Sequence, residues 1–369
     1  IEITASHNPQ QWNGLKCLNR DGLAPAVDEA ASIIDRFEKS RDRDFTSTSI
    51  DTVVKDLSGT TTHVQRVLDQ VDRNSIAEMR FVVTLDSVNA SGRDGGRQLL
   101  TALGCQLTHL NADKSGIFPH LPEPTQKNLQ ELAEVTKKCD AALGFAQDPD
   151  ADRLALIDEG GTYVGEEYTL ALVARRFLMR EGHGILAANL STSRMIDDLA
   201  EAREGVSIIR TAVGEANVVH ALRGAGVDSE NPGMGGEGNG GVICPSVCWV
   251  RDSLSAMAFV LELLATEGRS LSTLISEMPR YAMIKRAFDL SALGGRAGLE
   301  AVFARVRQAF ASERINDSDG LRIDRAHAWV HLRASNTEPI VRLIAEAPTN
   351  DAAESLINEV ASIAGFKTA

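Results

Sequence analysis

The chain has few basic residues for its length. Of its 369 residues, 38 are Lys or Arg and 51 are Asp or Glu, so the formal net charge is −13. This shortage of cations argues against a nucleic-acid partner, because no basic stripe is available to neutralise phosphates. No apolar stretch reaches the roughly 18 residues that a membrane span requires, and we therefore expect no membrane partner.

Cysteine is also sparse, and its distribution indicates free thiols. The five cysteines are scattered and odd in number: Cys17, Cys105, Cys139, Cys244 and Cys248. This pattern is typical of a reduced, cytoplasmic protein rather than of a disulfide scaffold. Cys244 and Cys248 have no second pair, so the sequence offers little support for a zinc site there.

What the chain does contain is an alternation of helix-period and strand-like segments, which favours α/β layers. A helix is expected at 57–71, linked by Asp72-Arg73-Asn74 to a βαβ unit in which a helix at 95–103 joins strands at 81–85 and 105–110. Further helices are expected at 125–137, 166–179 and 193–202, and further strands at 141–145, 154–157, 184–189, 206–210 and 242–244. The last 87 residues differ and resemble a small α+β domain.

These patterns predict an α/β fold of several domains. The expected domains are residues 1–58, 59–162, 163–282 and 283–369. The α/β pattern of the first domain begins in mid-domain, next to a candidate nucleophile, so we expect that domain to be N-terminally incomplete. The oligomeric state is left open between a monomer and a homodimer.

A serine in a turn lies close to the first residue, in Thr4-Ala-Ser6-His7-Asn8-Pro9. The plain interpretation is an Asx or Ser turn that closes a strand. The hydroxyl could instead carry a phosphoryl group, and the Asn13-Gly14 turn could return Lys16 towards it. Taken alone, Lys16 is an ordinary surface lysine.

Three aspartates alternate in Asp148-Pro-Asp150-Ala-Asp152-Arg153, between two apolar runs. Carboxylate oxygens are the ligands that Mg²⁺ prefers. An EF-hand is the rival metal site, because Glu159 falls at its twelfth position, but Arg153 stands where that loop needs glycine and both flanks resemble strands. A solvated acidic loop is the alternative without a metal. Arg153 would balance the carboxylates and could reach a phosphate.

Two later segments supply polar groups suited to a sugar phosphate. Glu237 and Asn239 lie in a glycine-dense stretch at 233–241, where the backbone can approach a ligand closely, although the stretch could be only a flexible loop. Arg333-Ala-Ser335-Asn336-Thr337 combines a guanidinium, hydroxyls and an amide, donors that hold a phosphate dianion. Its alternative interpretation is a plain turn between strands.

In this order, the four segments resemble the α-D-phosphohexomutase family of phosphomannomutase, phosphoglucomutase and phosphoglucosamine mutase. The resemblance spans Ser6 to Thr337 and implies three similar α/β domains and a C-terminal α+β domain around a central cleft. The chain differs from the family in two ways. Relatives often have Ser at the position of Asn239 and His at that of Gly241, and they carry a longer segment before the serine. The roles it implies are catalysis by Ser6, His7, Lys16 and Arg153; metal binding by Ser6, Asp148, Asp150 and Asp152; and substrate binding by Gly214, Glu237, Asn239, Arg333, Ser335, Asn336 and Thr337.

The resemblance implies an isomerase that moves a phosphoryl group between O1 and O6 of a hexose phosphate through phosphoserine. Mg²⁺ would be its metal and hexose 1,6-bisphosphate its activator. Lys16, its pKa lowered by burial, or His7 would move the hydroxyl proton. Among the activities of the family, we expect phosphomannomutase/phosphoglucomutase activity. The alternatives are a phosphoglucosamine mutase, a phosphatase that discharges phosphoserine to water, and a non-catalytic sugar-phosphate-binding protein if the N-terminal part is missing.

Overall fold

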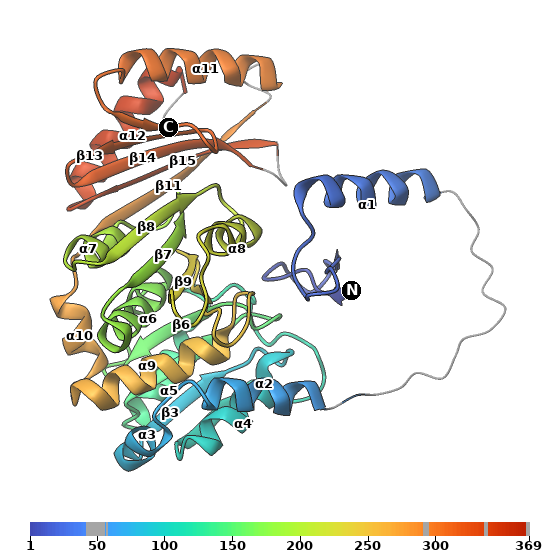
Figure 1. The fold of residues 1–369 in the computed structure, drawn as a ribbon, viewed down its shortest axis with the longest axis vertical. Coiled ribbons are helices and arrows are strands. Elements are labelled where there is room, and N and C mark those ends of the chain that lie inside the picture. Colours follow the sequence, from blue (N-terminus) through green and yellow to red (C-terminus); the bar gives the residue numbers. More distant parts are fainter. Residues whose placement is uncertain (42–55, 57, 291–294, 336–338, 367–369) are drawn as a thin grey trace. The chain divides into compact units, whose positions relative to one another are not determined.

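The computed structural model describes residues 1–41, 56, 58–290, 295–335 and 339–366. It divides into two compact units, Ile1–Arg176 with Asn239–Ile275, and Phe177–Gly238 with Ser276–Ala369, and each is described by itself. Figure 1 shows the helices and strands of both. Across the described ranges, no helix combines the length and the apolarity needed to cross a bilayer.

The first unit contains a four-stranded mixed sheet in the order β4-β3-β5-β6. Strand β3 is parallel to both β4 and β5, whereas β5 and β6 form an antiparallel pair. The strands are β3 (Val82–Asp86), β4 (Gln106–Leu110), β5 (Leu143–Gln147) and β6 (Leu154–Asp158), and the short strand β10 (Gly241–Ile243) also belongs to this unit. The helices are α2 (Ser58–Leu68), α3 (Arg73–Met79), α4 (Gly92–Ala102), α5 (Gln130–Lys138) and α9 (Ser253–Glu267), and both α6 (Glu166–Glu181) and α10 (Leu271–Glu277) run from this unit into the second.

The expected βαβ unit is present. Helix α4 joins β3 to β4, and the chain leaves the helix through Gly104, whose φ of 77° is in the left-handed region that suits glycine. Leu85, Leu99 and Phe145 are fully buried between the sheet and its helices. Burial of these large apolar side chains, at about 25 cal/mol per Å² of apolar surface, holds the sheet against its covering layer.

One expectation about this region is wrong. The link Asp72-Arg73-Asn74 is not a plain connection, because Asp72 caps a separate helix, α3. Its carboxylate accepts hydrogen bonds from the backbone N–H groups of Asn74 and Ser75, which satisfies donors that the first turn of a helix leaves unpaired.

The N-terminal segment forms a small sheet of its own. Strand β1 (Glu2–Ile3) pairs antiparallel with β2 (Leu15–Lys16), and no further strand joins them among the described residues. Helix α1 (Val27–Ser40) follows. The pairing brings Lys16 opposite Glu2 and leaves residues 4–14 as the loop between the two strands.

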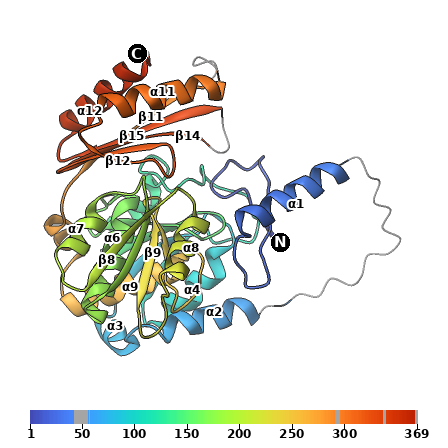
Figure 2. The same cartoon turned by 45° about the horizontal axis from the view of Figure 1, so that its top comes forward.

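The second unit contains a set of parallel strands and a separate antiparallel sheet. Strand β7 (Gly184–Asn189) lies between β8 (Val206–Thr211) and β9 (Gly233–Glu237), parallel to both, with helices α7 (Met195–Glu201) and α8 (Glu215–Gly224). The antiparallel sheet has the order β11-β15-β14-β13-β12, and α11 and α12 cover one of its faces (Figures 1 and 2). Its elements are β11 (Ala282–Asp289), α11 (Gly295–Ala309), β12 (Arg314–Asn316), β13 (Leu321–Arg325), β14 (Ala328–Ala334), β15 (Ile340–Ala347) and α12 (Asn350–Ala364).

The first half of the glycine-dense stretch is strand β9 and not a loop. Glycine is needed there because helix α8 packs directly on the strand. A Cβ on Gly235 would lie 2.5 Å from the carbonyl oxygen of Ala187 and 2.7 Å from Cγ1 of Val218. The glycines therefore let a helix approach more closely than any side chain on β9 would allow.

We predict that Gly235→Ala destabilises the protein by about 1–3 kcal/mol, because the added methyl group overpacks a closed contact. Urea unfolding followed by circular dichroism measures this change. Gly224→Ala at the end of α8 is the matched control, since nothing lies within 4 Å of its added Cβ, and it should leave stability unchanged or slightly raised. Equal effects of the two substitutions would contradict the packing argument.

Candidate active site

The loop between β1 and β2 holds Ser6 in an unusual backbone conformation. Ser6 has φ 52°, a left-handed value that is uncommon for a residue other than glycine. Its backbone N–H donates to Thr4 Oγ1 at 2.9 Å, and its Oγ lies 3.1 Å from Nδ1 of His7. Local hydrogen bonds thus fix the strained turn and place the serine hydroxyl against an imidazole.

The three aspartates occupy the tight turn between β5 and β6, as the alternation of polar and apolar residues predicts. Ala151, at its tip, has φ 59°, and its N–H donates to the carbonyl of Asp148 at 3.0 Å. The turn gathers Asp148, Asp150 and Asp152 so closely that one oxygen of each lies within 4.8 Å of the others.

Each carboxylate has one oxygen held by a nitrogen and one buried oxygen that accepts no hydrogen bond from the described residues. Asp148 Oδ1 accepts from the backbone N–H of Arg153 at 3.1 Å, Asp150 Oδ2 accepts from Lys16 Nζ at 2.7 Å, and Asp152 Oδ2 accepts from Arg251 Nη2. The unsatisfied atoms are Asp148 Oδ2, Asp150 Oδ1 and Asp152 Oδ1. Buried acceptors without partners are costly, so three of them together fit a cation.

The pKa values reflect both the mutual repulsion of the buried carboxylates and the positive charge of Lys16. Burial, and then the charges of Asp152 and Asp150, raise the pKa of Asp148 well above its usual value. Burial acts in the same direction on Asp150, but its hydrogen bond to Lys16 and the lysine charge outweigh burial and lower the pKa of Asp150. A divalent ion would stabilise the ionised form of Asp148, since an opposite charge favours the charged state of a carboxyl.

The expected lowering of the Lys16 pKa is wrong. Burial does act to lower it, but the hydrogen bond to Asp150 and the charges of Asp150, Asp152 and Glu2 raise the pKa of Lys16 overall. Its Nζ lies 3.8 Å from Asp152 and 3.7 Å from Glu2 as well. In this arrangement Lys16 is an ammonium ion, so it can donate a proton or balance charge but cannot act as a base.

The neighbouring histidine shows the opposite behaviour. Burial, and then the charge of Arg153, lower the pKa of His7, although Glu123, with Oε1 4.0 Å from Nε2, acts to raise it. His7 is therefore neutral at pH 7 and can accept a proton. Arg153 Nε lies 3.6 Å from Asp148 and 3.7 Å from Asp152, is buried, and makes no hydrogen bond within the described ranges.

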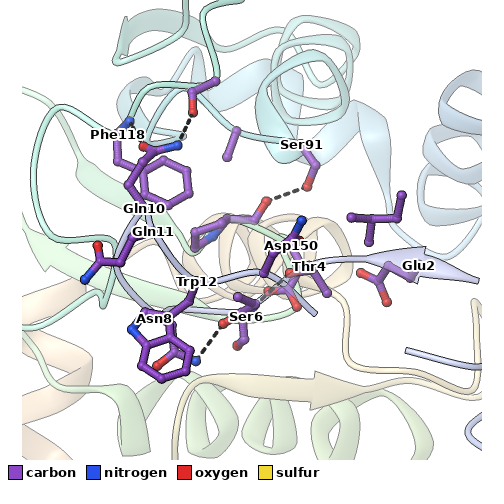
Figure 3. Close-up of a pocket in the computed structure, with 16 residues that line it drawn as sticks. Glu2, Thr4, Ser6, Asn8, Gln10, Gln11, Trp12, Ser91, Phe118 and Asp150 are labelled. Atoms are coloured by element: carbon purple, nitrogen blue, oxygen red, sulfur yellow. Dashed lines mark hydrogen bonds between the residues drawn. The ribbon is translucent and has the colours of Figure 1, made fainter. Parts of the chain in front are cut away.

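A cavity of about 590 Å³ in the first unit is lined by Ser6 and Asp150 together, with Thr4, Asn8 and Ser91 among its other walls (Figure 3). Ser91 Oγ donates to the carbonyl of Pro149 at 2.7 Å, which ties the aspartate turn to the start of α4. The structure thus brings the predicted nucleophile, lysine, arginine and carboxylates into one region.

Sequence reasoning missed Arg251. This residue follows β10 and forms a buried ion pair with Asp152. Nothing about its sequence neighbourhood marks it, because its partner lies 99 positions away. A Cβ on Gly241 would lie 2.2 Å from Arg251 Cδ, so the glycine makes room for this arginine. Asn239 Oδ1 accepts from the N–H of Gly241 at 3.1 Å and closes the intervening turn.

In the second unit, the predicted sugar-loop residues Glu237 and Gly214 are in contact. Glu237 is 4% exposed, and its Oε1 accepts from the backbone N–H of Gly214 at 2.9 Å and from Asn189 Nδ2 at 2.8 Å. Gly214 has φ 125° and precedes helix α8. The two residues form one polar cluster at the ends of β7 and β9.

The predicted phosphate-binding residues are at the end of β14. Arg333 is buried, and its Nε donates to Asp319 Oδ2 at 3.2 Å, an oxygen that also accepts from the N–H of Val213. Ser335 N–H donates to the carbonyl of Ile340 at 2.9 Å. Asn336 and Thr337 lie outside the described residues.

Comparison with known proteins gives the family. Models of the phosphoglucomutase/phosphomannomutase α/β/α domains I, II and III match residues 1–44, 61–161 and 165–281, and the model of the C-terminal domain matches residues 294–363. The chain belongs to the phosphoglucomutase/phosphomannomutase family. It is therefore a phosphohexomutase, and the predicted family and α/β fold class are confirmed.

Two curated relatives and one solved structure illustrate the likeness. The chain is 34% identical to "Phosphoglucomutase/phosphomannomutase" of Thermococcus kodakarensis, over 96% of this chain and 76% of the relative. It is also 34% identical to "Probable phosphoglucosamine mutase" of Methanopyrus kandleri, over 98% and 78%. The crystal structure of a phosphoglucomutase/phosphomannomutase family protein from Burkholderia thailandensis superposes with a TM-score of 0.80 at 25% identity, covering 98% of this chain and 76% of the other.

We predict that Arg251→Ala weakens the binding of a divalent ion by about 10–100-fold, the usual cost of removing a group that orients a metal ligand. Asp152 Oδ2 would lose its hydrogen bond, and the carboxylate would no longer be held with Oδ1 towards the other two. Isothermal titration with Mg²⁺ measures the affinity, and Arg251→Lys should recover part of it by restoring the charge. Unchanged affinity in Arg251→Ala would show that Arg251 does not position Asp152.

Proposed function

We propose that this phosphohexomutase interconverts the 1-phosphate and 6-phosphate of a hexose through phosphorylated Ser6 and a hexose 1,6-bisphosphate. The observation that supports this is the cavity shared by Ser6 and Asp150, next to three buried carboxylate oxygens that accept no hydrogen bond from the described part of the chain. A nucleophilic hydroxyl and a cation-binding cluster in one cavity are the requirements of phosphoryl transfer by covalent catalysis.

The metal is proposed to be Mg²⁺. The three unsatisfied atoms are all carboxylate oxygens, a hard donor set that suits Mg²⁺ and leaves coordination positions for phosphate oxygens or water. Asp148, Asp150 and Asp152 would hold the ion, and an oxygen of Ser6 or of its phosphate would complete the site. The ion would supply positive charge against the transferring phosphoryl group.

The chain's own residues supply the rest of the chemistry. The bond from Ser6 Oγ to phosphorus breaks as a substrate hydroxyl oxygen bonds to that phosphorus, and the hydroxyl proton leaves to a base. His7 is neutral and beside Ser6 Oγ, which suits it to accept that proton. Lys16, as an ammonium ion, can stabilise or protonate the serine oxygen, and Arg153 can offset charge on the phosphoryl group.

The substrate is proposed to bind through two further groups. Glu237, Gly214 and Asn239 would contact the sugar hydroxyls. Arg333, Ser335, Asn336 and Thr337 would bind the phosphate that is not reacting. Both ends of the sugar must react in turn, so the bisphosphate must rebind in the reverse orientation, and added hexose 1,6-bisphosphate would rephosphorylate Ser6 and activate the enzyme.

For the hexose, we propose glucose and mannose phosphates, with glucosamine phosphate as the alternative. Relatives with each name occur at 34% identity, so both deserve testing. Coupled assays with glucose 1-phosphate, mannose 1-phosphate and glucosamine 1-phosphate would rank kcat/KM. A value for glucosamine 1-phosphate above the other two would favour the alternative.

We predict that Ser6→Ala abolishes mutase turnover and phosphorylation by hexose 1,6-bisphosphate, because no acceptor oxygen remains. Intact-mass analysis of the wild type should show one added phosphoryl group that Ser6→Ala lacks. Ser91→Ala, in the wall of the same cavity, is the control and should still be phosphorylated. Release of inorganic phosphate without hexose 6-phosphate would favour a phosphatase, and a protein that is never phosphorylated would favour a non-catalytic binding protein.

We also predict that Arg333→Ala raises KM for the hexose phosphate by roughly 30- to 150-fold, since a lost guanidinium–phosphate contact costs about 2–3 kcal/mol. The contact stabilises the bound substrate and the transition state equally, so kcat at saturation should change much less. Steady-state kinetics separate the two constants. Arg342→Ala, at an exposed position on the neighbouring strand β15, is the control, and an unchanged KM in Arg333→Ala would exclude the phosphate-binding role.

A further inference from the structure

A second group of metal-ligating side chains lies in the first unit and is distinct from the aspartate cluster. His63 is on helix α2, Cys248 is in the turn after β10, and Asp252 is the N-cap of α9. One ligand atom of each lies within 4.8 Å of the others, and His63 Nε2 is 3.0 Å from Asp252 Oδ2. Three segments of the chain thus converge on one point with nitrogen, sulfur and oxygen donors.

The carboxylate of this group is fixed in orientation. Asp252 Oδ1 accepts from the backbone N–H of Leu254 at 3.1 Å, and Oδ2 accepts from that of Ser255 at 3.1 Å. These bonds form because Asp252 caps α9, and they prevent the carboxylate from rotating away from His63. Hydrogen bonds of this kind orient the ligands in metal sites.

The thiol is fixed by a local turn. The N–H of Cys248 donates to the carbonyl of Cys244 at 3.0 Å, and its Sγ lies 3.5 Å from the carbonyl of Val250. Cys244, the thiol that the sequence pairs with Cys248, is buried and is not part of the group. The partners that a zinc site needs are therefore supplied by Asp252, four positions further on, and by the distant His63, and not by a second cysteine.

The group is sheltered but reachable. The Asp252 side chain is 7% exposed and that of His63 is 30% exposed. His63 also lines an open pocket of about 360 Å³ on α2, together with Thr62 and Arg66, so its imidazole is reachable from solvent.

The ligand atoms lie near enough to one another to share one ion. Bonds of about 2.0–2.3 Å to a zinc ion place its ligand atoms roughly 3.3–3.8 Å apart. His63 Nε2 and Asp252 Oδ2 are 3.0 Å apart, and one ligand atom of each of the three residues lies within 4.8 Å of the others, so small shifts of the His63 and Cys248 side chains would be enough to enclose an ion. The ion would replace the direct contact between His63 Nε2 and Asp252 Oδ2.

We propose that His63, Cys248 and Asp252 form a second metal site, which binds Zn²⁺ or a similar borderline ion and leaves its fourth position to water. A mixed nitrogen, sulfur and oxygen set favours such ions over Mg²⁺, whereas the aspartate cluster offers only oxygens. The site fastens α2 to the turn before α9. Because Arg251 is adjacent to Asp252 and holds Asp152, the same ion steadies the segment that positions a carboxylate of the candidate active site.

Cobalt(II) titration tests the site, with Asp150→Asn protein as the starting chain so that the aspartate cluster is impaired. We expect one equivalent of Co²⁺ to give a thiolate-to-cobalt charge-transfer band in the near ultraviolet and the visible bands of a four-coordinate ion. Zn²⁺ should abolish both by displacement. Adding Cys248→Ser should remove the charge-transfer band, whereas adding Cys139→Ser, which replaces an exposed thiol elsewhere, should leave it unchanged.

Thermal unfolding provides the second measurement. Zn²⁺ should raise the Tm of the Asp150→Asn protein and should not raise it when His63→Gln is added, a change on the surface of α2 that retains a hydrogen-bonding side chain. A missing charge-transfer band, or one that survives Cys248→Ser, would overturn the proposal, as would an equal rise in Tm with His63→Gln. None of these outcomes depends on mutase activity, so the second site can fail while the proposed function stands.

Discussion

The arrangement of the candidate active site depends on the cost of burying three carboxylates together. Asp148 is fully buried, and Asp150 and Asp152 lie beside it in one turn. Such a cluster is stable only if positive groups reach it. Its own loop offers Arg153, whose backbone N–H binds Asp148, while Lys16 comes from β2 and Arg251 from the segment after β10. The cluster therefore requires that one segment before the aspartate turn in sequence and one segment after it both pack against the turn.

That requirement explains much of the local structure. The segment carrying Arg251 is fastened to the aspartate turn by backbone bonds, since Ser253 N–H donates to the carbonyl of Ala151 and Leu154 N–H donates to that of Gly240. The second contact is close enough that a Cβ on Gly240 would lie 2.4 Å from the Leu154 oxygen, and its φ is 82°. Gly240 is thus explained by this attachment, a reason that neither ligand access nor a flexible loop supplies.

Local sequence patterns predicted those features of the fold and site that are set by residues close together in sequence. The strands flanking the aspartates, the βαβ unit and the convergence of the alternate carboxylates all follow from period and spacing. The role of Arg251 and the raised pKa of Lys16 could not be predicted in this way, because their partners lie 99 and 134 positions away. Helix α3 was missed because a capping aspartate resembles a turn, and β9 because glycines packed under a helix resemble a flexible loop. The domain boundaries and the roles of the site residues stay predictions.

The same balance of charges reconciles an acidic chain with an anionic substrate. The three carboxylates are matched by the side chains of Lys16, Arg153 and Arg251, so the cluster as it stands is close to neutral. A divalent ion at the three unsatisfied oxygens would leave the cluster with a surplus of positive charge, equal in size to the negative charge of one phosphate dianion. Because this surplus lies in a largely buried site, screening by salt and by the net negative surface would weaken it little. The overall charge of −13 therefore sets solubility, whereas affinity for a phosphate depends on the few cations that the fold gathers around the aspartate turn.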